Sequence, residues 1–165
     1  MTTNNTNKEQ VKLRRFQPED AEETARLIAK TLRISNSKDY STENIEANVA
    51  SHSAEILTER AKRGHMYVAC EGPKIIGCGG IAPYWGSTTE SILLTIFVLP
   101  EYQGKGIGKQ IIQTLEQDEF FLRANRIEIP ASITAIEFYK KMGYDYKNGI
   151  AEVDEEQLCR MEKHR

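Results

Sequence analysis

The N-terminal part of the chain passes from the hydrophobic period of a strand to that of helices. Residues 11–16 alternate apolar and polar side chains, which predicts a strand, and residues 17–33 repeat apolar side chains at helical spacing. A second helix is expected over residues 40–64, where the same spacing follows Ser41 and Thr42, either of which suits an N-cap. The chain is therefore expected to begin with one strand and two consecutive helices.

The middle of the chain favours strands. Residues 65–72 and 74–85 predict two strands around a turn at Gly72-Pro73. Residues 90–100 predict a longer strand that is apolar on both faces, as expected for a central strand covered on both sides. After a glycine-rich turn, the remaining expected elements are a helix over 109–125, a strand over 126–132, a helix over 133–143 closed by Gly143, and two strands within 144–163 with a turn at Asn148-Gly149.

This order of elements predicts a mixed α/β fold, because strands and helices do not alternate strictly. Neither an internal repeat nor a linker divides the sequence. A length of 165 residues suits one domain, which we expect over residues 10–165. The polar residues 1–9 are expected to form a disordered N-terminal tail.

Charge and cysteine content exclude several classes of function. The net charge is −2, which argues against a nucleic-acid partner because domains that bind nucleic acids are normally basic. Cys70, Cys78 and Cys159 lack the spacing of a zinc site, so we expect reduced thiols in a cytoplasmic protein and no metal. The sequence has neither a signal peptide nor a stretch of about 20 apolar residues, so no membrane partner is expected.

The glycine-rich stretch PEYQGKGIGKQ (residues 100–110) is the main candidate for a phosphate-binding loop. A Walker A loop does not fit, because Gln103 stands where its first glycine belongs and Gln110 replaces the hydroxyl residue that binds magnesium. A dinucleotide fingerprint does not fit either, since the third glycine is misplaced and the motif follows two consecutive helices. A sharp turn that needs glycines only for backbone freedom remains open on the loop alone.

Two motifs together resemble the GNAT superfamily of acyl-CoA-dependent N-acyltransferases. The first is QGKGIG (residues 103–108), which is similar to the family signature Gln/Arg-x-x-Gly-x-Gly/Ala between an apolar strand and a long helix. The second is AIEFYKKMGY (residues 135–144), which resembles the family's helix with an aromatic-Tyr pair and a Gly-aromatic end. The expected order of elements follows the family from about residue 11 to 162.

The resemblance implies a central mixed sheet of about six or seven strands, flanked by about four helices and splayed at the central strands. It also implies acetyl-CoA as co-substrate. Backbone N–H groups of the loop would bind the pyrophosphate of coenzyme A, and the open end of the strand over 90–100 would hold the pantetheine arm. The residues implied in cofactor binding are Phe97, Val98, Leu99, Gln103, Gly104, Lys105, Gly106, Ile107, Gly108, Lys109, Ser132, Phe138 and Tyr139.

Acyl transfer to an amine needs an oxyanion donor, a proton for the leaving thiolate and a base. The oxyanion donor is expected to be the backbone N–H of Val98 or Leu99. Tyr139 matches the family tyrosine that protonates the thiolate, although packing beside Phe138 is the alternative. Many relatives carry a glutamate inside the central strand.

This chain has no acid inside that strand, which leaves the base open. Glu90 at the start of the strand and Glu128 on its neighbour are the candidate bases, each acting through water. Ser132 would either bond the cofactor or cap the following helix. Tyr40, Tyr84 and Trp85 are the candidate acceptor-binding residues.

The function expected from the sequence is N-acetyl transfer to a primary amine of a small molecule or a protein, by direct attack in a ternary complex. The alternative, motivated by the missing strand glutamate, is a catalytically degenerate module that binds acyl-CoA or another protein. The amine and the oligomeric state are left open, with a homodimer as one option.

Overall fold

The computed structural model describes residues 10–165, so the expected disordered tail, residues 1–9, lies outside the described residues. The elements follow the expected order closely. Their bounds are β1 Val11–Arg15, α1 Ala21–Ser35, α2 Thr42–Ala50, α3 Ala54–Arg63, β2 His65–Glu71, β3 Lys74–Pro83, β4 Glu90–Val98, α4 Ile107–Leu115, α5 Glu119–Leu122, β5 Arg126–Ser132, α6 Ile136–Lys141, β6 Asp145–Tyr146 and β7 Leu158–His164.

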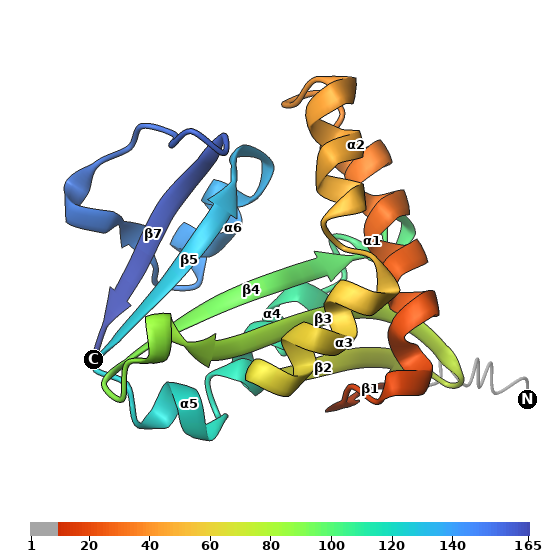
Figure 1. Cartoon of the computed structure of the whole chain (residues 1–165), viewed down its shortest axis with the longest axis horizontal. Coiled ribbons are helices and arrows are strands. Elements are labelled where there is room, and N and C mark those ends of the chain that lie inside the picture. The colour runs from red at the N-terminus through yellow and green to blue at the C-terminus, as the bar shows by residue number, and fades with distance from the viewer. Residues whose placement is uncertain (1–9) are drawn as a thin grey trace, which may run out of the picture.

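Seven strands form one mixed sheet in the order β1-β2-β3-β4-β5-β7-β6. β4 and β5 are parallel, and the other neighbours are antiparallel. Helices α1 and α3 cover one face of β1–β4, with α2 packed against α1, and α4 and α5 cover the other face (Figure 1). Fully buried side chains such as Ile28 of α1 and Ile111 of α4 pack on the two faces, in one continuous core. These features confirm the expected mixed α/β fold.

The sheet opens between its two parallel strands. Pairing of β4 with β5 runs only from Glu90–Arg126 to Ile92–Glu128. Beyond that point the two strands diverge as the arms of a V (Figure 1). Pro130, which cannot donate to a ladder, lies beyond the last pair, as expected where pairing stops. In the described part of the chain, the second half of β4 therefore has a backbone edge that no strand covers.

An irregularity in β4 lies next to this open edge. The register with β3 shifts between Cys78 and Gly80, so that β4 carries one extra residue around Thr95. Thr95 has a φ of 60°, a left-handed conformation that costs a β-branched residue on the order of 1–3 kcal/mol. The Cys78 thiol donates to the Thr95 carbonyl oxygen at 3.2 Å and supports the bulge. Burial raises the pKa of Cys78 to about 12, which makes it an inert thiol.

Two expected helices are each divided in two. The stretch 40–64 breaks at Ser51–Ser53, because the hydroxyl of Ser53 accepts from the Ile56 N–H at 3.3 Å and starts α3. The stretch 109–125 breaks before Asp118, whose carboxylate caps α5 by accepting from the Phe120 N–H at 2.8 Å. The sheet is thus flanked by six helices in the described part of the chain, where the sequence predicted about four.

None of the helices between residues 10 and 165 has the length and apolar character needed to cross a membrane.

Candidate active site

The glycine loop between β4 and α4 is open to solvent and has the conformation of an anion cradle. Gly104 and Gly106 have φ angles of 76° and 80°, which strongly favour glycine. A Cβ at either position would meet no atom within 4 Å, so these glycines serve the backbone conformation and leave space above the loop. Gln103 to Lys105 are exposed.

Six consecutive backbone N–H groups of this loop have no acceptor within residues 10–165. Among residues 10–165, the N–H groups from Gly104 to Lys109 donate to no backbone or side-chain oxygen, and the first helical bond runs from the Gln110 N–H to the Gly106 carbonyl at 3.1 Å. The free N–H groups and the positive end of the α4 dipole converge on the same place. That combination binds phosphate groups without a metal. The loop therefore fits the pyrophosphate of coenzyme A.

Gly108 differs from the other two glycines. A Cβ there would lie 3.0 Å from Cζ of Phe138, so the ring of Phe138 occupies the space beside it. Gly108 was implied in cofactor binding, but the space that its Cβ would take is filled by Phe138 and is not open to a ligand. Gly108 instead allows α4 and α6 to approach each other, and Phe138 is part of that contact.

The Gln103 side chain joins the loop to its neighbours. Its Nε2 donates to the Ser35 hydroxyl at 2.9 Å and to the Val98 carbonyl at 3.0 Å. Thr31 also donates to that carbonyl at 3.3 Å. Gln103 therefore fixes the loop against the C-terminal end of α1 and the end of β4.

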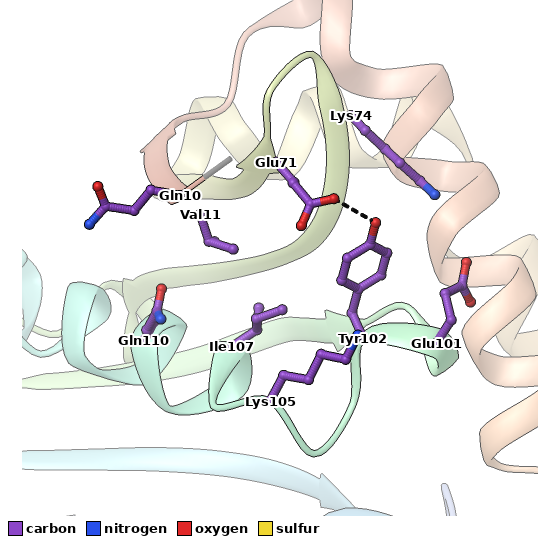
Figure 2. A pocket seen from close by; sticks show the side chains of 9 residues that line it. All are labelled: Gln10, Val11, Glu71, Lys74, Glu101, Tyr102, Lys105, Ile107 and Gln110. Atoms are coloured by element: carbon purple, nitrogen blue, oxygen red, sulfur yellow. Dashed lines mark hydrogen bonds between the residues drawn. The ribbon is translucent and has the colours of Figure 1, made fainter. Parts of the chain in front are cut away.

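The side chain of Lys105 points away from the free N–H groups. Its ammonium lies 5.2 Å from the ring centroid of Tyr102, on the wall of a hollow of about 910 Å³ behind the loop (Figure 2). Lys74 lies at a similar distance, 5.3 Å, on the same ring. The two lysines face Glu71 and Glu101 across this hollow, so its charged lining is balanced. The row of N–H groups is accordingly the better site for an anionic cofactor.

Backbone geometry narrows the expected oxyanion donor to one residue. The Leu99 N–H donates to the Ile76 carbonyl at 2.9 Å, so it is not available for an oxyanion, and that alternative is wrong. Successive N–H groups of a strand point to opposite edges. The N–H of Val98 therefore faces the gap between β4 and β5, where the sheet is open. Phe97 contributes its ring to the opposite side of the strand, where His52 packs against it.

Tyr139 lies buried on α6, with Phe138 and Tyr144 as aromatic neighbours at centroid distances of 5.3 and 6.4 Å. Burial, and secondarily the Cys78 thiol, raise the pKa of Tyr139 well above its ordinary value, so the phenol keeps its proton. Its hydroxyl makes no hydrogen bond to another residue in 10–165. Within the same residues, the one side-chain polar atom that is both inaccessible to solvent and without a partner is Oγ1 of Thr24, so the Tyr139 hydroxyl is not fully buried. The Tyr139 hydroxyl therefore keeps some solvent access and has a proton to donate.

The two expected bases, Glu90 and Glu128, are held in ion pairs. Arg126 lies 2.8 Å from Glu90 and 3.1 Å from Glu128. Glu128 is 1% exposed and also pairs with Lys147 at 2.8 Å and Arg160 at 3.5 Å. Hydrogen bonding to Arg126 lowers the pKa of Glu90, which weakens it as a base.

Position also separates Glu90 from the open edge. Glu90 and Val98 are the two ends of β4, about 25 Å apart along a strand that rises about 3.3 Å per residue. Both glutamates belong to the ion-pair cluster around Arg126, at the end of β4 and β5 where the strands still pair.

Tyr40 and Ser132 lie near the junction of β5 and α6. The Tyr40 hydroxyl accepts from the Ile133 N–H at 2.8 Å and donates to the Gln157 carbonyl at 2.7 Å. The Tyr40 hydroxyl therefore links the α1–α2 connection to the C-terminal segments through two hydrogen bonds to backbone groups. The Ser132 hydroxyl makes no capping bond, so the expectation of a helix cap is wrong and the cofactor-binding alternative stays a prediction.

Tyr84 and Trp85 lie at the other end of β4, next to the last β3–β4 pair, Pro83–Ser91. The Tyr84 ring is flanked by the cations of Arg126 at 4.9 Å and Lys147 at 5.6 Å. Trp85 is 91% exposed. The structure therefore groups Tyr84 with the ion-pair cluster around Arg126 and does not bring it near Tyr40.

Sequence reasoning missed two residues that contact β4 beside its open edge. His52, in the break between α2 and α3, packs edge-on against Phe97 with ring centroids 5.4 Å apart. Arg60 of α3 donates to the Thr95 hydroxyl at 3.1 Å. Neither belongs to a motif; the only available signal was the Ser-His-Ser sequence that interrupts the expected helix.

Within residues 10–165, no group of three or more His, Cys, Asp or Glu side chains is arranged to hold a metal ion.

Comparisons with known proteins agree with this geometry. The model of the acetyltransferase (GNAT) domain matches residues 62–146, just over half of the chain. The uncharacterized N-acetyltransferase YafP of Escherichia coli K12 is 23% identical over 134 residues, which cover 81% of each chain.

Two solved structures share the fold. The PaiA N-acetyltransferase of Thermoplasma acidophilum, determined in complex with coenzyme A, superposes with a TM-score of 0.81 at 20% identity, covering 94% of this chain and 99% of its own. A GCN5-related N-acetyltransferase of Rhodopseudomonas palustris superposes with a TM-score of 0.76 at 24% identity, covering 93% and 95%.

Proposed function

Because the chain belongs to the acetyltransferase (GNAT) domain family, we propose that it transfers an acetyl group from acetyl-CoA to a primary amine, by direct attack in a ternary complex. The observation that carries the proposal is the row of six free N–H groups from Gly104 to Lys109, directly after the uncovered edge of β4. One extended thioester ligand with a pyrophosphate uses both features at once.

Each part of the site has a distinct task in this proposal. Acetyl-CoA supplies an activated acetyl group. The N–H groups of the loop and the α4 dipole hold its phosphates. The positive φ angles of Gly104 and Gly106 set the direction of those N–H groups. The N–H of Val98 faces the gap and stabilises negative charge that develops on the acetyl oxygen.

Tyr139 donates its proton to the leaving sulfur. A buried phenol with a raised pKa stays protonated in the resting enzyme, which is the state a general acid requires. Its two aromatic neighbours restrict the ring, and the absence of a hydrogen-bond acceptor within residues 10–165 leaves the hydroxyl free for a ligand.

The first experiment measures thermal stabilisation by acetyl-CoA and by ATP with magnesium. Acetyl-CoA at about 100 times its Kd adds about 2.7 kcal/mol of stability, which raises the Tm of a protein of this size by roughly 5–10 °C. ATP is expected to give no shift. The proposal fails if saturating acetyl-CoA leaves the Tm unchanged.

The second experiment follows the release of free thiol with pooled primary amines. Amine-dependent thiol release in equal amount to acetylated product supports transfer. A rapid burst of acylated enzyme before the amine is added would replace direct attack by a covalent route. A thermal shift without thiol release across a broad amine panel would support a non-catalytic acyl-CoA-binding module instead.

A further inference from the structure

Helices α2 and α3 bring a histidine and an arginine to the face of β4 beside the uncovered edge. His52 lies in the break between the helices and contacts Phe97, the neighbour of Val98, with ring centroids 5.4 Å apart. Arg60 bonds to the hydroxyl of Thr95, the residue of the bulge. The two side chains therefore approach β4 from the α1–α3 side, immediately beside the point where the sheet opens.

Arg60 is a half-buried guanidinium without a carboxylate. Of the described arginines, three are half-buried: Arg60, Arg126 and Arg160. Arg126 pairs with three carboxylates and Arg160 with three, whereas no carboxylate of residues 10–165 lies within ion-pair distance of Arg60. Its bonds go to neutral oxygens, those of Thr95 and of the Ser51 carbonyl. A buried cation normally has an anionic partner, so a ligand that supplies one would complete this site.

His52 has one ring nitrogen occupied and one available. Its Nδ1 lies 2.7 Å from the Asn48 carbonyl, and because a carbonyl only accepts, Nδ1 carries the hydrogen. The Nε2 atom then presents a lone pair, and it has no partner among residues 10–165. Burial, with the charge of Arg60 adding to it, lowers the pKa of His52, so the ring is neutral near pH 7. The other neighbours of the ring, Asn48, Ser51 and Phe97, are uncharged.

We propose that His52 and Arg60 form the acceptor end of the site, and that the acceptor is an amine that also carries a carboxylate. Arg60 pairs with the carboxylate and orients the acceptor. His52 takes a proton at Nε2 from the ammonium group and so produces the neutral amine that attacks. This assignment also supplies the base that Glu90 and Glu128, both held by Arg126, do not supply.

The proton and electron balance closes with the groups at hand. The ammonium nitrogen loses one proton to His52, which later releases it to water. The nitrogen lone pair forms the C–N bond as the C–S bond breaks, and the sulfur keeps that electron pair. The sulfur takes the Tyr139 proton, the second nitrogen proton restores Tyr139, and the amide keeps the third. One proton is released for each acetyl group transferred.

This proposal rests on the proposed acetyl transfer. Matched pairs of acceptors distinguish a failure of the acceptor assignment from a failure of the proposed function. Acetylation of 4-aminobutyrate is compared with that of butylamine, and each of several amino acids with its carboxamide. The carboxylated acceptors are expected to have at least a 10-fold higher kcat/KM. Arg60→Gln is expected to remove this preference, and Arg60→Lys to restore part of it. Arg63→Gln, an exposed arginine at the end of the same helix, is the control and keeps the preference.

A binding measurement provides a readout other than turnover. In the presence of coenzyme A, which carries no acetyl group, carboxylated amines are expected to raise the Tm of the wild type and of Arg63→Gln, but not of Arg60→Gln. The acceptor assignment is overturned if thiol release is equally fast with carboxylated and uncarboxylated amines and if Arg60→Gln does not change it. The proposed acetyl transfer would be unaffected by that result. Loss of the acetyl-CoA shift itself overturns the proposed function.

The role of His52 is tested by the pH dependence of kcat/KM. The wild type is expected to lose activity as the pH falls through the lowered pKa of His52, below about 6.5. His52→Gln is expected to lower kcat/KM about 100-fold and to lack this acidic limb, whereas Glu90→Gln keeps it. An NMR titration of the His52 ring is expected to give the same pKa as this acidic limb. An unchanged limb in His52→Gln, or its loss in Glu90→Gln, excludes His52 as the base.

Discussion

The two sides of the candidate site are built from different kinds of atoms. On the cofactor side, residues 104–109 and the edge of β4 present backbone N–H groups, and two glycines with positive φ set their direction. On the acceptor side, the break between α2 and α3 presents the side chain of His52 to β4, and α3 presents that of Arg60. The first surface recognises what every acyl-CoA has in common, and the second is free to vary with the amine.

This difference determines which substitutions each side tolerates. A backbone surface survives changes of side chain as long as its φ angles remain accessible, so its sensitive positions are glycines. A side-chain surface depends on individual charges and hydrogen-bonding atoms, which one substitution removes.

The largest effect is expected from Gly106→Val. A β-branched residue at a φ of 80° costs about 1–3 kcal/mol, and its side chain enters the space above the loop, so acetyl-CoA affinity is expected to fall about 1000-fold. Isothermal titration with coenzyme A measures the loss.

Gly86→Val is the matched control for backbone strain. Gly86 has a φ of 75° and also has no atom within 4 Å of its would-be Cβ, but it lies before β4, far from the loop. Equal loss of affinity in the two variants would show that general destabilisation, and not the loop, is responsible.

The second effect is expected from Tyr139→Phe. Removing the hydroxyl takes away the proton for the leaving sulfur, and we expect kcat to fall about 100-fold with little change in the Kd of coenzyme A. Tyr144→Phe is the control, because the hydroxyl of the buried Tyr144 donates to Glu116 at 3.1 Å and is therefore not free for a ligand. If both variants keep wild-type turnover, Tyr139 is a packing residue only.

The contrast between the two sides also explains what the sequence could predict. The loop was recognisable because most of its chemistry is local: Gly104 and Gly106 act through their own backbone, and one of the two side-chain bonds of Gln103 reaches Val98, five positions away. Strand and helix order was recognisable for the same reason, since hydrophobic period is a local property. The breaks at Ser53 and Asp118 were missed, because each helix pattern continues across them and only the caps reveal the interruption.

The individual residues proposed for the acceptor side could not be predicted, because their contacts are made by packing between distant segments. His52 and Arg60 contact residues 45 and 35 positions away, Phe97 and Thr95, and no spacing in the sequence links them. The same applies to Glu128, whose partners Arg126, Lys147 and Arg160 turn an expected base into an ion-pair residue. Charges could be counted from the sequence, but their partners could not.

A smaller effect is expected from Gly108→Ala, which separates packing from cofactor access within the loop. The new Cβ would lie 3.0 Å from Phe138, so we expect a loss of stability of about 1–2 kcal/mol, or roughly 2–8 °C in Tm. Thermal unfolding without ligand measures it. The double variant Gly108→Ala/Phe138→Leu is expected to lose less than the sum of the single variants, because leucine vacates the space. Additive losses would mean that the two residues do not interact.

The smallest effect is expected in the pH dependence of stability, and it concerns the acceptor side alone. The pKa of His52 is lower in the folded protein than its unfolded value of about 6.5, because burial and the charge of Arg60 disfavour the imidazolium. The unfolded chain therefore binds the proton more tightly, so the stability contributed by the neutral ring is present above about pH 6.5 and is lost as the pH falls through the folded-state pKa.

Denaturant unfolding between pH 5 and 8 is expected to show a steeper acidic loss of stability in the wild type than in His52→Gln. The slope is expected to lessen in Arg60→Gln, where one of the two causes of the lowered pKa is removed. The cofactor loop contributes nothing to this difference, so Gly106→Val is expected to keep the wild-type slope. Parallel curves for wild type and His52→Gln would show that His52 is solvated and able to take up a proton in the folded state as easily as in the unfolded chain, which removes the physical basis for a neutral base at this position.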